Sequence, residues 1–159
     1  MYFAYGSNMM SERLIERVGN NGEAGIGFLI GYTLKFNKLS RDGSGKGNIV
    51  PDASEKVWGV LYKLTEEQLK ILDSFENGYE RKIVEIQTVG KTVEAVAYIS
   101  DATQSETLPY GWYLEFFKVG AKQHGLPKSV QEHLNSVATT TDMDEERKLE
   151  NLRRVERAT

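Results

Sequence analysis

Apolar and aromatic residues alternate strictly with smaller or polar residues along one stretch of the chain, from Ala24 to Phe36. Successive side chains of a strand point to opposite faces of a sheet, so this period of two predicts a half-buried β-strand. The apolar and aromatic members of the alternation are Ile26, Phe28, Ile30, Tyr32, Leu34 and Phe36.

Further strand-like segments follow at Val57 to Leu64, Arg81 to Val89 and Thr92 to Ile99. The last two are expected to form a hairpin that turns at Gly90-Lys91. The glycines of Asp42 to Asn48 suggest a phosphate-binding loop, but the Lys-Ser/Thr ending and the following helix of a P-loop are missing. We therefore expect a mobile loop there, and sheet over most of the first hundred residues.

A short helix is expected between these strands. Thr65 opens it, and Gln68 three residues later completes a capping-box pattern. Leu69, Leu72 and Glu76 are spaced i, i+3 and i+7, which would place the carboxylate of Glu76 on the same helix face as the leucines. An acid on an apolar face is unusual, and it makes Glu76 a candidate for chemistry.

Two interpretations of Glu76 stay open at this level. In one, Asn77-Gly78 ends the helix and Glu76 lies at a frayed end, in water or paired with Arg81, like the solvated acids Asp73 and Glu80. In the other, Glu76 lines a cavity and carries a proton in both directions during a reaction.

Three more helices are expected in the second half of the chain: from Pro109 to Gly125, from Lys128 to about Val137, and from Asp144 to Arg157. The last has only a narrow apolar stripe among many charges, so we expect a main domain at 1–140 and a peripheral helix at 141–159. The first has a wide apolar stripe made of Trp112, Tyr113, Phe116, Phe117, Gly120 and Ala121, in which Tyr113 is either core or cavity wall.

The N-terminus reads as strand, turn and helix start. Tyr2 to Tyr5 is strand-like, Gly6-Ser7-Asn8 has the composition of a tight turn, and helical spacing begins directly afterwards. Either Ser11 or Asn8 is placed to cap the helix. Such a segment is either a simple turn or a site where backbone N–H groups converge on a carboxylate, a phosphate or a developing oxyanion.

Composition limits the chemistry available. The chain has 159 residues, which fits one domain, and its net charge of −3 gives no reason to expect nucleic acid as a partner. There are no cysteines and only two histidines, so we expect no metal site. No apolar run approaches the roughly 20 residues of a membrane span, so we expect no membrane partner and a cytoplasmic location. Any chemistry has to use carboxylates, hydroxyls and backbone groups.

Four separated blocks of the chain resemble the γ-glutamylcyclotransferase family in content, order and spacing. They are Tyr2-Phe-Ala-Tyr-Gly-Ser-Asn8 with Met9, Val57-Trp-Gly-Val-Leu-Tyr62, Leu72-Asp-Ser-Phe-Glu76 with Gly78 and Tyr79, and Gly120-Ala-Lys-Gln-His-Gly-Leu-Pro127 preceded by Tyr113. The resemblance implies an α+β fold, a small mixed and curved β-sheet that closes toward a barrel with flanking helices.

The resemblance also implies an activity. A γ-glutamyl amino acid or amine would be converted to 5-oxoproline by attack of its own α-amine on its γ-carbonyl, with no cofactor. By this resemblance Glu76 is the general acid/base, and the turn of Tyr5, Gly6, Ser7 and Asn8 holds the γ-glutamyl group. Tyr113 would line the pocket, with Tyr79 as a further candidate.

The chain departs from the family at Val130, where members often have a tyrosine, and the identity of the leaving amine cannot be read from the sequence. Two alternatives therefore remain beside a general γ-glutamylcyclotransferase. One is a non-catalytic module of the same fold that binds a small anion. The other is a cyclotransferase specific for a γ-glutamyl-amine pathway intermediate.

Overall fold

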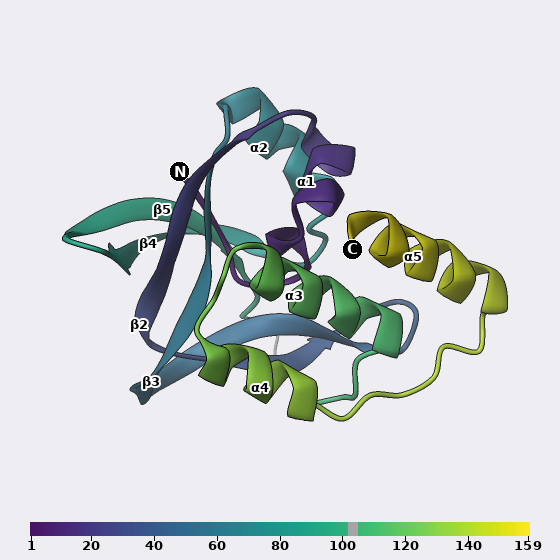
Figure 1. Cartoon of the computed structure of the whole chain (residues 1–159). Helices are drawn as coiled ribbons and strands as arrows, with labels where there is room; N and C mark the ends of the chain where they lie inside the picture. The colour runs from purple at the N-terminus through teal and green to yellow at the C-terminus, as the bar shows by residue number, and fades with distance from the viewer. Residues whose placement is uncertain (102–104) are drawn as a thin grey trace.

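A computed structural model of the chain describes residues 1–101 and 105–159, and these form a closed five-stranded barrel with helices on its outside (Figure 1). The strands follow one another in the order β1-β3-β2-β4-β5, and β1 closes the barrel by pairing with β5. The expected α+β fold is therefore confirmed. In chain order the elements are β1 (Tyr2–Ala4), the 3₁₀ helix η1 (Ser7–Met9), α1 (Ser11–Val18), β2 (Gly22–Leu39), β3 (Gly45–Lys63), α2 (Glu66–Asp73), β4 (Glu80–Thr88), β5 (Lys91–Ile99), α3 (Gly111–Gln123), α4 (Lys128–Ser136) and α5 (Glu145–Ala158).

The alternation in β2 predicts the strand correctly. The apolar residues of this alternation do not, however, form one continuous buried face. The register between β2 and β3 shifts between Ile30 and Tyr32, and Gly31 lies at this shift with a φ of 82°. A bulge interrupts the period of two along a strand, so burial does not follow the alternation throughout. Ile30 is accordingly 59% exposed, whereas its neighbour Leu29 is buried in the barrel.

The prediction of a mobile loop at Asp42 to Asn48 is wrong. Only a tight turn precedes Gly45, where β3 begins, well before the expected Val57. Two of the glycines mark close approaches: a Cβ at Gly45 would clash with the carbonyl oxygen of Thr107, and one at Gly47 would lie 2.8 Å from the ring of Phe117. Glycine is needed here because other chain segments touch the backbone of β3.

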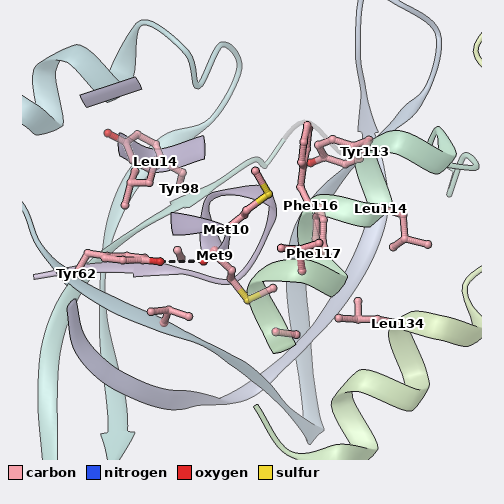
Figure 2. Packing of buried hydrophobic residues seen from close by; sticks show 14 of the residues in the cluster. Met9, Met10, Leu14, Tyr62, Tyr98, Tyr113, Leu114, Phe116, Phe117 and Leu134 are labelled. Carbon is pink, nitrogen blue, oxygen red and sulfur yellow. Dashed lines mark hydrogen bonds between the residues drawn. The ribbon is translucent and has the colours of Figure 1, made fainter. Parts of the chain in front are cut away.

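Buried apolar residues form two clusters on the two faces of the sheet. One fills the barrel and contains Phe3 and its register partner Leu61. The other lies between the barrel and the helices, where Met9 and Met10 pack beside Phe116 and Phe117 of α3 (Figure 2). The helix α3 therefore holds the segment that follows β1, and with it the N-terminal turn, against the barrel.

The helix α3 packs closely against the N-terminal segment at Gly120. A Cβ at Gly120 would lie 2.6 Å from Met10 N and 2.6 Å from Met9 C, and backbone atoms cannot yield as a flexible side chain can. In the described part of the chain, no helix is long and apolar enough to cross a membrane.

Candidate active site

The tight turn expected at Gly6-Ser7-Asn8 is present, but the helix cap that follows it differs from the expected one. Gly6 has a φ of −122°, outside the left-handed region, and Ser7 begins a single 3₁₀ turn closed by a bond from Met9 N to Gly6 O at 3.0 Å. The N-cap of α1 is Met10, which makes no side-chain cap bond, so neither Ser11 nor Asn8 caps the helix. The side chain of Asn8 is consequently available for another partner.

That partner is Glu76. The Asn8 Nδ2 donates to Oε1 of Glu76 at 2.9 Å and to the hydroxyl oxygen of Tyr2, also at 2.9 Å. The guanidinium of Arg17 on α1 completes the group, because its Nη1 lies 2.9 Å from Asn8 Oδ1 and 3.3 Å from Glu76 Oε1. The consecutive elements η1 and α1 thus meet a carboxylate that is distant from both in the sequence, and whose side chain is 13% exposed.

Glu76 does not lie on the helix, as its spacing from Leu69 and Leu72 suggested. The helix α2 ends at Asp73, and Glu76 sits in the turns that follow, where its N–H donates to Asp73 O at 3.2 Å. The Ser74 hydroxyl donates to Ile71 O at 2.6 Å and so competes for a carbonyl of the last helical turn. The chain then bends at Gly78, whose φ is 79°.

The pairing of Glu76 with Arg81, considered from the sequence, is also wrong. Arg81 instead holds Asp73, with Nε 2.7 Å and Nη2 2.6 Å from its two carboxylate oxygens, and it bonds Glu66 at 2.8 Å. The hydroxyl of Tyr98 donates to Asp73 at 2.7 Å. Asp73 is therefore a structural ion-pair residue and not a free solvated acid, and its bonds to Arg81 and Tyr98 lower the pKa of its carboxyl.

Tyr79 and Tyr113 are brought together by the backbone of Gly47 on β3. The hydroxyl of Tyr79 donates to Gly47 O at 2.6 Å, and the hydroxyl oxygen of Tyr113 accepts from Gly47 N at 3.1 Å. Tyr113 belongs to the buried core and also lines the cavities beside Glu76, so the two interpretations of this residue both hold.

A small cavity of about 40 Å³ lies where the turn, Glu76 and the tyrosines meet. Such a volume has room for about three water molecules, or for one charged end group of a ligand. Burial raises the pKa of Tyr2, Tyr5 and Tyr113 above its ordinary value, and the charge of Glu76 adds to this effect. These hydroxyls are neutral hydrogen-bonding groups at neutral pH. All site residues expected from the sequence line this cavity, namely Tyr5, Gly6, Ser7, Asn8, Glu76, Tyr79 and Tyr113.

A second, larger cavity of about 460 Å³ adjoins the first and shares Ser7, Glu76, Tyr79 and Tyr113 with it. Its wall is rich in cations that the sequence analysis did not select. They are Arg13 and Arg17 from α1, Lys38 from β2, Arg41 from the turn after it, and Lys46 from β3. The one sequence signal for them is the i, i+4 spacing of Arg13 and Arg17, which puts both on one helix face.

Val130 lies elsewhere. It is on α4 and lines a separate cavity with Trp58 and His133, so it does not approach Glu76 through either cavity described above. Among residues 1–101 and 105–159 there is no group of three or more histidine, cysteine or acidic side chains that could hold a metal ion.

Comparison with known proteins gives one consistent result. The sequence profile described as "Gamma-glutamyl cyclotransferase, AIG2-like" matches residues 2–115. A Bos taurus protein named Gamma-glutamylcyclotransferase is 30% identical over 148 residues, which is 86% of this chain and 78% of that protein. The Homo sapiens protein of the same name is 29% identical over 147 residues, with the same two coverages.

Solved structures agree with these sequence matches. A structure titled "Gamma-glutamyl cyclotransferase" has a TM-score of 0.86 at 26% identity and covers 98% of this chain and 97% of its own. The crystal structure of an uncharacterized Homo sapiens protein has a TM-score of 0.83 at 28% identity, and covers 93% and 95% of the two chains. The range matched by the family profile includes the N-terminal turn, Glu76 and Tyr113.

Proposed function

The chain belongs to the gamma-glutamyl cyclotransferase, AIG2-like family and is an enzyme of this type, and from this premise we propose how its site performs the reaction. The substrate is a γ-glutamyl amino acid or γ-glutamyl amine. Its α-amino nitrogen forms a bond to its own γ-carbonyl carbon, and the bond from that carbon to the leaving nitrogen breaks. The products are 5-oxoproline and a free amino acid or amine, with no change of oxidation state.

Glu76 is the proton carrier in this proposal. The α-ammonium group has to lose a proton before its nitrogen can attack, and the leaving nitrogen has to gain one. Asn8 and Arg17 both bind Oε1 of Glu76, and within residues 1–101 and 105–159 no donor is bonded to its Oε2. That second oxygen can therefore accept the proton from the ammonium and return it to the leaving nitrogen.

The small cavity holds the charged end of the glutamyl group, and the larger cavity holds the leaving group. Gly6, Ser7 and Asn8 supply backbone and amide groups around the small cavity, while Tyr5, Tyr79 and Tyr113 close it. Because the attack is intramolecular, the main contribution of such a pocket is to hold the substrate bent, with amine and carbonyl in contact. The single observation that carries the proposal is the position of Glu76, held by Asn8 at the boundary of both cavities.

A direct assay tests this function. The purified protein is incubated with a panel of γ-glutamyl dipeptides and γ-glutamyl amines, and 5-oxoproline is measured by chromatography. Wild type is expected to form 5-oxoproline, and the Glu76→Gln variant is expected to form at least about 100-fold less. Absence of 5-oxoproline with every substrate would contradict the proposal.

A non-catalytic protein that binds a small anion is the second candidate, and the cations of the larger cavity are the observation that favours it. The two candidates differ in one measurable way. A binding protein would show saturable binding of a γ-glutamyl dipeptide by calorimetry without any release of 5-oxoproline, whereas an enzyme shows both.

A further inference from the structure

The larger cavity carries more positive charge than the proposed reaction requires. Five cationic side chains line it, against the single carboxylate of Glu76. Arg17 is bonded to Glu76, and Lys46 is bonded to Asp42 at 3.1 Å. For Arg13, Lys38 and Arg41, no carboxylate lies within 4.0 Å in the described ranges 1–101 and 105–159. Three cations at this wall are thus left without an acidic partner.

Arg13 is the least satisfied of these cations. Its guanidinium lies over the ring of Phe116, 4.2 Å from the centroid, and its Nε is shielded from solvent with no hydrogen-bond acceptor among the described residues. A buried donor without a partner is costly, and water or a ligand is the usual remedy. Burial, with a smaller effect of Arg17, lowers the pKa of Arg13 to about 9, so the side chain remains a cation at pH 7.

The cations also repel one another. Arg13 and Arg17 are four residues apart on α1, a spacing at which like charges destabilise a helix. Lys46, which lies 4.5 Å from the ring centroid of Tyr113, has a pKa lowered mainly by burial, and the nearby charge of Arg13 lowers it further. Like charges gathered in a partly desolvated cavity become favourable once an anion enters between them.

The proposed reaction puts the leaving group in this cavity. A neutral leaving amino acid brings one carboxylate, which leaves the charge of two of the three unpaired cations uncompensated. We propose that the leaving group of the preferred substrate is acidic, with at least two carboxylates, as in a γ-glutamyl dipeptide whose second residue is glutamate. This proposal rests on the proposed function, because it uses the same site and names its substrate class.

The test compares two nearly isosteric substrates, γ-glutamyl-glutamate and γ-glutamyl-glutamine, which differ by one negative charge in the leaving group. Wild type is expected to prefer γ-glutamyl-glutamate in kcat/KM by roughly 10- to 100-fold, the scale of one or two hydrogen bonds to a charged group. Most of this preference should appear in KM, and it should shrink between low salt and 0.5 M salt because salt screens the cations. Equal kcat/KM values for the two substrates would overturn the proposal.

Two substitutions test whether the cations of the larger cavity cause the preference for γ-glutamyl-glutamate. Arg13→Gln and Lys38→Gln are each expected to lower kcat/KM more for γ-glutamyl-glutamate than for γ-glutamyl-glutamine, and so to reduce the preference between the two substrates. Arg153→Gln and Lys122→Gln are the matched controls, since both residues are exposed and neither lines the cavity. A preference that is undiminished in both cavity variants contradicts the proposal. If circular dichroism shows that Arg13→Gln does not fold, the Lys38→Gln variant and the comparison of the two substrates with wild type still test the proposal.

A binding measurement separates failure of this proposal from failure of the proposed function. Calorimetry on Glu76→Gln compares the affinity for the same two dipeptides without turnover. If wild type forms no 5-oxoproline from any substrate, the proposed function fails, and tighter binding of γ-glutamyl-glutamate would still support the acidic ligand. If 5-oxoproline is formed and the two dipeptides bind equally, the acidic leaving group fails and the cyclotransferase function stands.

Discussion

Asn8 Nδ2 lies 2.9 Å from Oε1 of Glu76, although the two residues are 68 positions apart in the chain. This bond joins the turn that follows β1 to the turn that follows α2. Arg17 bonds both residues, so neither can move without breaking contacts to the other two. The carboxylate of Glu76 is therefore held by two partners before any substrate binds, which is the condition for efficient positioned catalysis.

Glu76→Gln should separate binding from chemistry. The amide is nearly isosteric with the carboxylate but cannot accept a proton from the ammonium group, so we expect kcat to fall about 100- to 10,000-fold with a much smaller change in KM. Steady-state release of 5-oxoproline measures this. Glu80→Gln is the matched control, because Glu80 is exposed at the start of β4, and it should leave kcat unchanged. Equal losses in both variants would remove Glu76 from its assigned role.

Asn8→Ala should lower turnover through the position of Glu76. The variant removes the donor to Oε1 and also the acceptor of Arg17, so the carboxylate gains freedom to leave its productive orientation. Misplacement by about 1 Å can cost up to about 100-fold, and we expect kcat to fall by roughly 10- to 100-fold, more than KM changes. Asn135→Ala on the exposed face of α4 is the control. An unchanged kcat in a folded Asn8→Ala variant would show that this hydrogen bond does not position the base.

Local signals predicted the elements whose ends are set by neighbouring residues. The capping box is present with both bonds, from Gln68 N to Thr65 Oγ1 at 3.1 Å and from Thr65 N to Gln68 Oε1 at 3.0 Å. The hairpin of β4 and β5 turns at Val89-Gly90, one residue from the expected place. Both features depend on residues within a few positions of each other, and such information is contained in a short stretch of sequence.

The geometry around Glu76 depends on distant partners and could not be read locally. Helical periodicity continued the pattern of Leu69 and Leu72 to Glu76, but α2 ends at Asp73. Glu76 is oriented by Asn8 and Arg17, which no spacing along the chain brings near it. Periodicity selected Glu76 as a candidate but placed it on the wrong element, and the resemblance to a known family supplied its expected role.

The gathering of cations around the larger cavity could not be read from the local sequence either. In the sequence, Arg13, Lys38 and Lys46 look like ordinary surface residues, because most lysines and arginines are exposed to solvent. Only closure of the barrel, with α1 and α3 packed outside it, puts them around one space. The close approaches at Gly45 and Gly47 were hidden for the same reason, and those glycines looked like loop residues.

Gly120→Ala should destabilise the protein. The added Cβ would lie 2.6 Å from backbone atoms of Met9 and Met10, so α3 or the segment after η1 has to shift. Overpacking of this kind costs typically about 1–3 kcal/mol in the free energy of unfolding, which urea denaturation measures. Gly111→Ala at the start of α3 is the control, since its Cβ would meet only Thr139 Oγ1 at 3.8 Å. A Gly120→Ala variant as stable as wild type would mean that α3 is less closely packed than described.

The final prediction concerns Asp142, a buried acid before α5. Its carboxylate accepts from Trp112 Nε1 at 2.9 Å and from Arg147 Nε at 2.7 Å, and so ties the start of α5 to α3. The bonds from Arg147 hold the pKa of Asp142 far below its ordinary value. Asp142→Asn keeps the shape but presents a neutral group to Arg147, and we expect a loss of about 1–3 kcal/mol in the free energy of unfolding at pH 7.

The pH dependence of that loss gives the sharper test. A carboxyl whose pKa is lower in the folded than in the unfolded state stabilises the fold above its unfolded pKa of about 3.9, and the stabilisation is lost as pH falls toward the folded value. The difference in stability between wild type and Asp142→Asn should therefore be constant from pH 5 to 8 and shrink below about pH 4, as urea unfolding across this range measures. Glu55→Gln is the control, because Glu55 is an exposed acid on β3. If the Asp142→Asn difference stays constant down to pH 2, the ion pair with Arg147 does not contribute to stability in the way that its geometry indicates.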